Sequence, residues 1–111
     1  MKLRDLSAYL QLEPIQVSDD ARDVVGAYTG DLLSWVMTRL EADFAWVTIM
    51  NNVNVIAVAA LADASCVIFS ENAEISADVI EKAKAQNINL YRTVKSSFEI
   101  SYMIGKVLYA E

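Results

Sequence analysis

The spacing of the hydrophobic residues changes several times along this chain, and each spacing indicates a different kind of element. Between residues 32 and 40, apolar side chains recur three and four positions apart, as they do on one face of an α-helix. Residues 45–50 and 66–69 are instead short runs rich in β-forming residues, which indicates buried strands. The two patterns alternate, so the sequence predicts an α/β protein.

The segments before and between these elements extend the alternation. We expect a helix over residues 2–12 that Pro14 ends, because a proline cannot continue a helix. Residues 13–17 are predicted to be extended, and an apolar strand is expected to follow Asp23. Residues 55–62 are apolar on every side, but their four alanines favour a buried helix capped by Asn54. Residues 29–31 are expected to cap the helix at 32–40.

The C-terminal third completes the pattern. Ser76 is expected to cap a helix that Asn87 ends in a left-handed turn, and residues 88–92 form a short strand candidate. Ser96 and Glu99 have the spacing of a capping box before an amphipathic helix that runs to residue 108. The order predicts a mainly parallel sheet with right-handed crossovers and flanking helices.

Length and charge narrow the function classes. A chain of 111 residues is one domain's worth: a helix and an extended segment at 1–19, then a core at 20–108. The formal net charge of −6 opposes a nucleic-acid role, because phosphates require a basic face, and it opposes binding to an anionic membrane. The apolar runs are too short to span a bilayer and the N-terminus lacks a secretory signal, so we expect a cytoplasmic protein.

Residues needed for common catalytic chemistry are scarce. The chain has no histidine to activate a serine or the lone Cys66, which lies in an apolar run and is expected to be a core residue. Its three glycines do not form a phosphate-binding loop. The acidic residues between 19 and 23 are expected to form a solvated turn rather than a metal site. We therefore predict neither an enzyme nor a cofactor.

Polar residues follow three of the predicted strands, and the carboxyl ends of parallel strands are where α/β proteins bind ligands. The candidates for binding a small anionic or nucleotide-like ligand are Asn51, Asn52, Asn54, Ser70, Glu71, Asn72, Arg92, Thr93 and Lys95. Helix N-termini and the two cations would attract an anion, whereas Glu71 would oppose it, or cancel the attraction if paired with Arg92. The alternative is that these residues serve only as caps, turns and solvated charges.

Three further segments are distinctive: Gly26 with residues 28–34 (Tyr-Thr-Gly-Asp-Leu-Leu-Ser), residues 54–59 (Asn-Val-Ile-Ala-Val-Ala) and residues 80–84 (Ile-Glu-Lys-Ala-Lys). Together they resemble the DRTGG domain family over about residues 20–108. The signature of the family, an Asp-Arg element and a Thr-Gly-Gly element, is degenerate here: the two places read Asn-Asn-Val-Asn at 51–54 and Ser-Glu-Asn at 70–72. The resemblance implies a fold related to the N-terminal domain of HPr kinase/phosphorylase and a regulatory role. It also implies that the chain belongs to a subgroup of the family that is encoded near iron-only hydrogenase genes.

Two functions are consistent with these observations. The first is a non-catalytic regulatory or ligand-sensing module. The second is a homodimeric interaction or scaffold protein that docks a redox or hydrogenase-related partner without a small-molecule ligand. The apolar share is about 53% when glycine is counted and tyrosine is not, above the usual ~45–50%, which favours a subunit interface. Trp35, Trp46, Tyr28, Met37, Met103 and Tyr109 are expected to fill a core or an interface.

Overall fold

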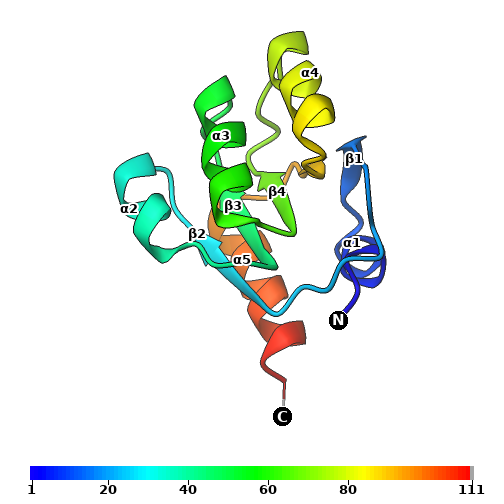
Figure 1. The fold of residues 1–111 in the computed structure, drawn as a ribbon. Coiled ribbons are helices and arrows are strands. Elements are labelled where there is room, and N and C mark those ends of the chain that lie inside the picture. The colour runs from blue at the N-terminus through cyan, green and yellow to red at the C-terminus, as the bar shows by residue number, and fades with distance from the viewer. Residues whose placement is uncertain (111) are drawn as a thin grey trace.

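The computed structural model describes residues 1–110, in which a five-stranded sheet lies between two layers of helices (Figure 1). The strands are β1 (Glu13–Gln16), β2 (Gly26–Thr29), β3 (Phe44–Thr48), β4 (Cys66–Phe69) and β5 (Leu90–Arg92). The helices are α1 (Leu3–Leu10), α2 (Leu33–Arg39), α3 (Val53–Ala62), α4 (Ala77–Gln86) and α5 (Ser97–Leu108). The predicted α/β fold with a mainly parallel sheet is confirmed.

The sheet has the order β1-β5-β4-β3-β2. All neighbours from β2 to β5 are parallel, whereas β1 pairs antiparallel with β5 and places Glu13 opposite Arg92. The N-terminal strand therefore forms one edge of the sheet, next to the strand that comes last in the sequence.

Each face of the sheet packs against its own helices, because successive strand residues point to opposite faces. Trp46 and Phe69 point toward α2, α3 and α4, where they pack with Ile56 of α3. Val47 and Ile68 point to the other face, toward α1 and α5. The sheet thus separates two hydrophobic cores.

Two expectations about the helices are corrected. α1 ends at Leu10, and Gln11 takes a left-handed conformation with φ 54°, so Pro14 does not end the helix but lies within β1. In α2, Val36 and Leu40 are buried as the spacing predicts, but Leu32 and Met37 are exposed. The apolar stripe of this segment is therefore wider than the face that the core covers.

The helix caps agree with the sequence only in part. Asn52 rather than Asn54 caps α3, because its side chain accepts a hydrogen bond from the Asn54 amide at 3.0 Å. Ser96 caps α5 through the Glu99 amide, and Asn87 ends α4 with φ 57°, as expected. Ser76 precedes α4 without a side-chain cap bond, and α2 also has none.

Asp31 was expected to help begin α2, but it stabilises the end of β3 instead. Its Oδ1 accepts hydrogen bonds from Thr48 Oγ1 at 2.8 Å and from the Ile49 amide at 2.9 Å. This carboxylate therefore positions the loop after β3, from which part of the candidate site is built.

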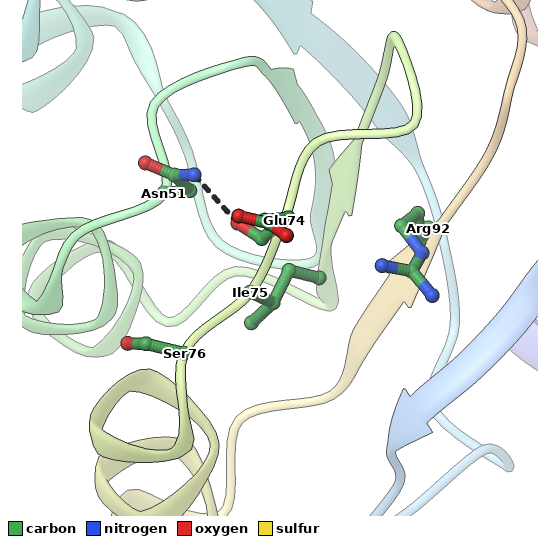
Figure 2. A pocket seen from close by; sticks show the side chains of 5 residues that line it. All are labelled: Asn51, Glu74, Ile75, Ser76 and Arg92. Carbon is green, nitrogen blue, oxygen red and sulfur yellow. Dashed lines mark hydrogen bonds between the residues drawn. The ribbon is translucent and has the colours of Figure 1, made fainter.

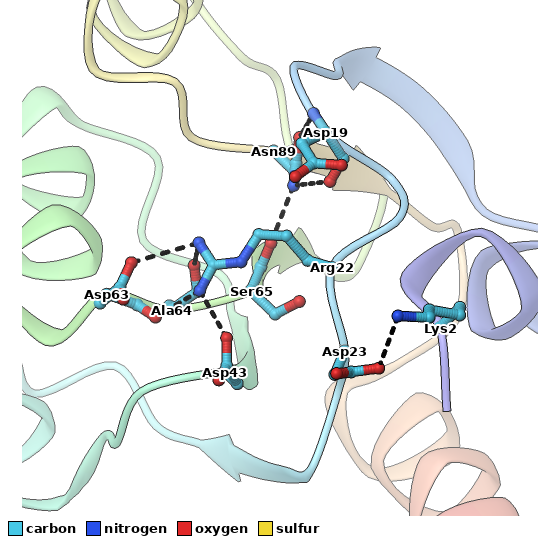
Figure 3. Close-up of polar contacts among 9 residues, drawn as sticks. All are labelled: Lys2, Asp19, Arg22, Asp23, Asp43, Asp63, Ala64, Ser65 and Asn89. Carbon is cyan, nitrogen blue, oxygen red and sulfur yellow. Dashed lines mark hydrogen bonds and ion pairs between the residues drawn. The ribbon is translucent and has the colours of Figure 1, made fainter.

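Polar contacts hold the β1–β2 connection against the amino-terminal ends of the parallel strands (Figure 3). Arg22 bonds Asp43 at 2.7 Å and Asp63 at 3.2 Å, and Lys2 bonds Asp23 at 3.0 Å. Asp19 Oδ1 accepts from the Ala21 amide, so the acidic segment is a turn. No helix within residues 1–110 is long and apolar enough to cross a bilayer.

Candidate functional site

The three predicted loops lie together at the carboxyl ends of the parallel strands β3, β4 and β5. The loop after β3 contributes residues 49–52, the loop after β4 residues 70–76, and the loop after β5 residues 93–96. Direct bonds join the last two loops: the Glu71 and Asn72 amides donate to the carbonyls of Lys95 and Thr93 at 2.8 and 2.9 Å.

A cleft of about 600 Å³ opens at these strand ends, on the side that carries α3 and α4. Figure 2 shows the side chains that line it: Asn51, Glu74, Ile75, Ser76 and Arg92. Asn51 Nδ2 donates to the Glu74 carbonyl at 2.5 Å and so links the two loops on either side. The volume falls within the range of about 300–1,000 Å³ that is usual for small-molecule sites.

Arg92 supplies the positive charge of the cleft, and that charge is already paired. Its Nε and Nη2 donate to the two carboxylate oxygens of Glu13 at 2.9 and 3.0 Å, and its Nη1 donates to the Ala73 carbonyl at 3.3 Å. The bond to Glu13 raises the pKa of Arg92, and the bond to Arg92 lowers the pKa of Glu13. The partner of Arg92 is thus Glu13, not Glu71.

The carboxylate of Glu74 adds a further negative charge, which contributes to the raised pKa of Arg92. Arg92 therefore faces two carboxylates, that of Glu13 in its ion pair and that of Glu74 in the lining of the cleft. An anionic ligand gains the full attraction of Arg92 only if it displaces Glu13. A neutral ligand that hydrogen-bonds Asn51 and Ser76 would leave the ion pair intact.

The other predicted residues serve the loops themselves. Ser70 is fully buried and shares a 2.6 Å hydrogen bond with Ser97 Oγ. Thr93 is also buried, and its hydroxyl accepts from the Lys95 amide at 3.2 Å. Glu71 and Asn72 are exposed and have φ values of 61° and 53°, so they form the left-handed part of a turn. The structure thus brings Asn51 and Arg92 into the cleft and leaves Ser70 and Thr93 beneath the loops.

Asn54 belongs to a different surface. It lines an apolar groove of about 350 Å³ between α2 and α3, together with Leu33, Met37, Ala57, Val58 and Leu61. Leu61 is 75% exposed. This groove has the composition of a protein-binding surface rather than that of an anion site.

The sequence did not identify Glu13, Glu74 and Ile75 as members of the site. Glu13 lies 79 residues before Arg92, and only the antiparallel pairing of β1 with β5 brings them together. The sequence shows only that Glu13 and Arg92, in two predicted extended segments, have opposite charges. Opposite charges alone do not specify which strands pair. Glu74 and Ile75 follow the polar residues after β4, where loop length alone cannot show which side chains face a cleft.

Metal-ligating and thiol chemistry are not apparent at these strand ends. Across residues 1–110, no three His, Cys, Asp or Glu residues come together as ligands for an ion. Cys66 is fully buried in β4, and burial raises the pKa of its thiol to about 12. It packs in the core, as predicted.

The fold has a counterpart among solved structures. No family model matches the chain, and no curated protein matches it. Three solved chains do match. One is the crystal structure of the CBS and DRTGG domains of the regulatory region of Clostridium perfringens pyrophosphatase, complexed with its activator diadenosine tetraphosphate.

That match has a TM-score of 0.74 at 17% sequence identity, and it covers 97% of this chain and 49% of the pyrophosphatase chain. The chain described here therefore spans about half the length of that neighbour. At this identity the likeness concerns the fold alone. The structure and the match together support a DRTGG-like α/β fold for this chain.

Proposed function

We propose that this chain is a non-catalytic, cytoplasmic regulatory domain that senses a small anionic or nucleotide-like ligand in the cleft at the carboxyl edge of its sheet. The observation that carries the proposal is the position of Arg92, which lies in the cleft and donates from Nε and Nη2 to the two carboxylate oxygens of Glu13. A guanidinium in this geometry also matches a phosphate or carboxylate of a ligand.

The pairing of Arg92 with Glu13 provides a route from binding to a response. Glu13 begins β1, and its ion pair joins this edge strand to β5. A ligand phosphate that takes over the guanidinium would release Glu13 and weaken the attachment of β1. Binding at the cleft would therefore change the edge of the sheet and α1, which precedes β1.

The structural neighbour is the regulatory region of an enzyme and was crystallised with a nucleotide activator. This supports a test with nucleotides first. The cleft volume of about 600 Å³ suits a mononucleotide or smaller ligand.

The experiment is a thermal-shift and calorimetric titration with AMP, ATP, diadenosine tetraphosphate and inorganic phosphate. Wild-type protein is compared with Arg92→Gln and Glu13→Gln. Both variants break the same ion pair, but only the second retains the guanidinium. A ligand at 100 times its Kd adds about 2.7 kcal/mol of stability, which is a rise in Tm of about 10 °C or more for a domain of this size.

We expect binding to be lost in Arg92→Gln and to tighten in Glu13→Gln, because the competing carboxylate is gone. Equal loss in both variants would mean that the ion pair only holds the cleft in shape. No shift with any of the four compounds would overturn the anion-sensing proposal.

A second candidate function is favoured by the apolar groove between α2 and α3. We propose as the alternative an interaction module in which Leu61 and Met37 bind a redox or hydrogenase-related protein, as the sequence resemblance to the hydrogenase-associated subgroup suggests. Titration against an iron-only hydrogenase or one of its maturation proteins tests it. Binding that Leu61→Glu removes and Arg92→Gln preserves would favour this function, and no binding to either would remove it.

A further inference from the structure

We propose that the β2 edge of the sheet, with the adjoining flanks of α2 and α5, is the interface at which two copies of this chain pair about a two-fold axis. In this arrangement β2 of one copy pairs antiparallel with β2 of the other. The interface lies at the far end of the sheet order from β1 and Glu13, so it does not depend on the function proposed for the cleft.

The two edges of the sheet differ in how they are protected. β1 carries Pro14, which has no N–H to offer, and Glu13, which is ion-paired across to β5. β2 has the sequence Gly-Ala-Tyr-Thr, with neither a charge nor a proline. Within the described part of the chain β2 pairs with β3 alone, so one side of the strand presents unpaired backbone groups. Such an edge is a template for another strand.

On one face of the sheet, α2 extends this edge with an aromatic side chain. Leu33 and Met37 line the groove toward α3. Trp35 lies two positions from Met37, about 200° around the helix, and therefore on the flank away from α3 and above the β2 edge. Its side chain is 56% exposed, and the Arg39 guanidinium stacks 4.1 Å from its ring centre.

On the other face, α5 provides a second flank. The 2.6 Å hydrogen bond between Ser101 Oγ and Thr29 Oγ1 shows which side of α5 runs along β2. Phe98 and Gly105 lie three positions before and four after Ser101, so they share this side. Phe98 is 81% exposed. A Cβ added at Gly105 would meet no atom within 4 Å, which leaves room for another helix to approach.

These features favour a second copy over an unrelated strand. A strand from another protein would satisfy the backbone of β2 but leave Trp35 and Phe98 uncovered. A two-fold axis at β2 instead places α2 beside the second α2 and α5 beside the second α5, with the paired helices antiparallel and their dipoles opposed. It also brings Arg39, at the end of α2, toward Asp31, which precedes α2 in the other copy.

The surface available is adequate for such a dimer. A fully buried aromatic side chain contributes about 150–250 Å², and Trp35 and Phe98 are each more than half exposed. They offer roughly 200–300 Å² per copy, about a third of the ~800 Å² that each partner buries in a standard interface. The backbone of β2 and its exposed neighbours Val25 and Leu32 add to this area.

The test is the oligomeric state of the full chain by light scattering and sedimentation across the micromolar range. The variants are Trp35→Glu and Phe98→Glu, with Leu61→Glu as the matched control. All three replace an exposed apolar residue by the same charge, but Leu61 lies in the α2–α3 groove away from β2. Circular dichroism confirms that each variant is folded.

We expect a wild-type dimer whose Kd rises about tenfold or more in each edge variant and is unchanged in Leu61→Glu. Amide exchange at residues 27–29 should be slow in the dimer and fast in Phe98→Glu. A monomeric wild type, a dimer that only Leu61→Glu dissociates, or exchange at β2 that is equally fast in the dimer would each overturn the proposal.

Discussion

Gly26 and Gly105 show how differently two glycines are constrained in the same chain. Neither needs a positive φ, because the positive-φ residues within 1–110 are all non-glycine. At Gly26 an added Cβ would lie 2.6 Å from Cε1 of Phe44, whereas at Gly105 it would meet open space. Gly26 is therefore required by packing against its neighbouring strand, and Gly105 is a weak point in an otherwise regular helix.

We predict opposite effects of alanine at these two positions. Gly105→Ala should raise the free energy of unfolding by about 0.5–1 kcal/mol, because alanine loses less backbone entropy in a helix. Gly26→Ala should lower it by about 1–3 kcal/mol through overpacking against Phe44. Urea unfolding in the Phe98→Glu background measures both without a contribution from self-association. A destabilised Gly105→Ala would show that α5 is strained at this turn.

Among the elements, the β1–β2 connection is held by a buried side chain as well as by the ion pairs of Arg22 and Lys2. Asn89 precedes β5 and is 1% exposed. Its Oδ1 accepts from the Ser18 and Asp19 amides at 2.8 and 3.0 Å. Its Nδ2 donates to the Asp19 and Ser65 carbonyls at 2.9 and 3.0 Å (Figure 3). The asparagine thus joins the connection to the loop before β4.

We predict that Asn89→Ala destabilises the chain by about 1–3 kcal/mol, because it leaves several backbone groups without partners. Asn54→Ala is the matched control: Asn54 is exposed in the first turn of α3, and its replacement should change stability by less than ~0.5 kcal/mol. Equilibrium denaturation measures the difference. Equal effects would mean that the Asn89 hydrogen bonds contribute little.

At the scale of the whole molecule, the ion pair of Glu13 with Arg92 joins segments 79 residues apart. The hydrogen bond from Arg92 lowers the pKa of Glu13 below that of a free carboxyl group. The ionised form thus favours the folded state, and this stabilisation is present above the ordinary pKa of about 4.3 and is lost as the pH falls through the lowered value. Lys2 lowers the pKa of Asp23 in the same way.

We therefore predict that wild-type protein exceeds Glu13→Gln in Tm at neutral pH, and that the difference shrinks as the pH falls below about 4. Asp23→Asn should show the same direction. Thermal unfolding monitored by circular dichroism from about pH 7 to about pH 3 measures both. A difference that widens toward acid would contradict the lowered pKa of Glu13.

Local sequence patterns specify the order of the elements from β3 onward. Runs such as residues 66–69 and the capping box at Ser96 are local signals, and local signals specify local structure. The alternation of strands and helices requires a parallel sheet whose loops meet at the carboxyl ends of the strands, and this alone places Asn51 and Arg92 near each other.

Tertiary packing determines which apolar residues are buried and which charged residues pair. Trp46 and Trp35 both lie in apolar segments, yet the first is fully buried under α2 and α3 and the second is more than half exposed on α2. The pairing of β1 with β5 likewise chose Glu13 as the partner of Arg92. Periodicity shows which residues share a face, but burial and charge pairing depend on which distant element covers that face.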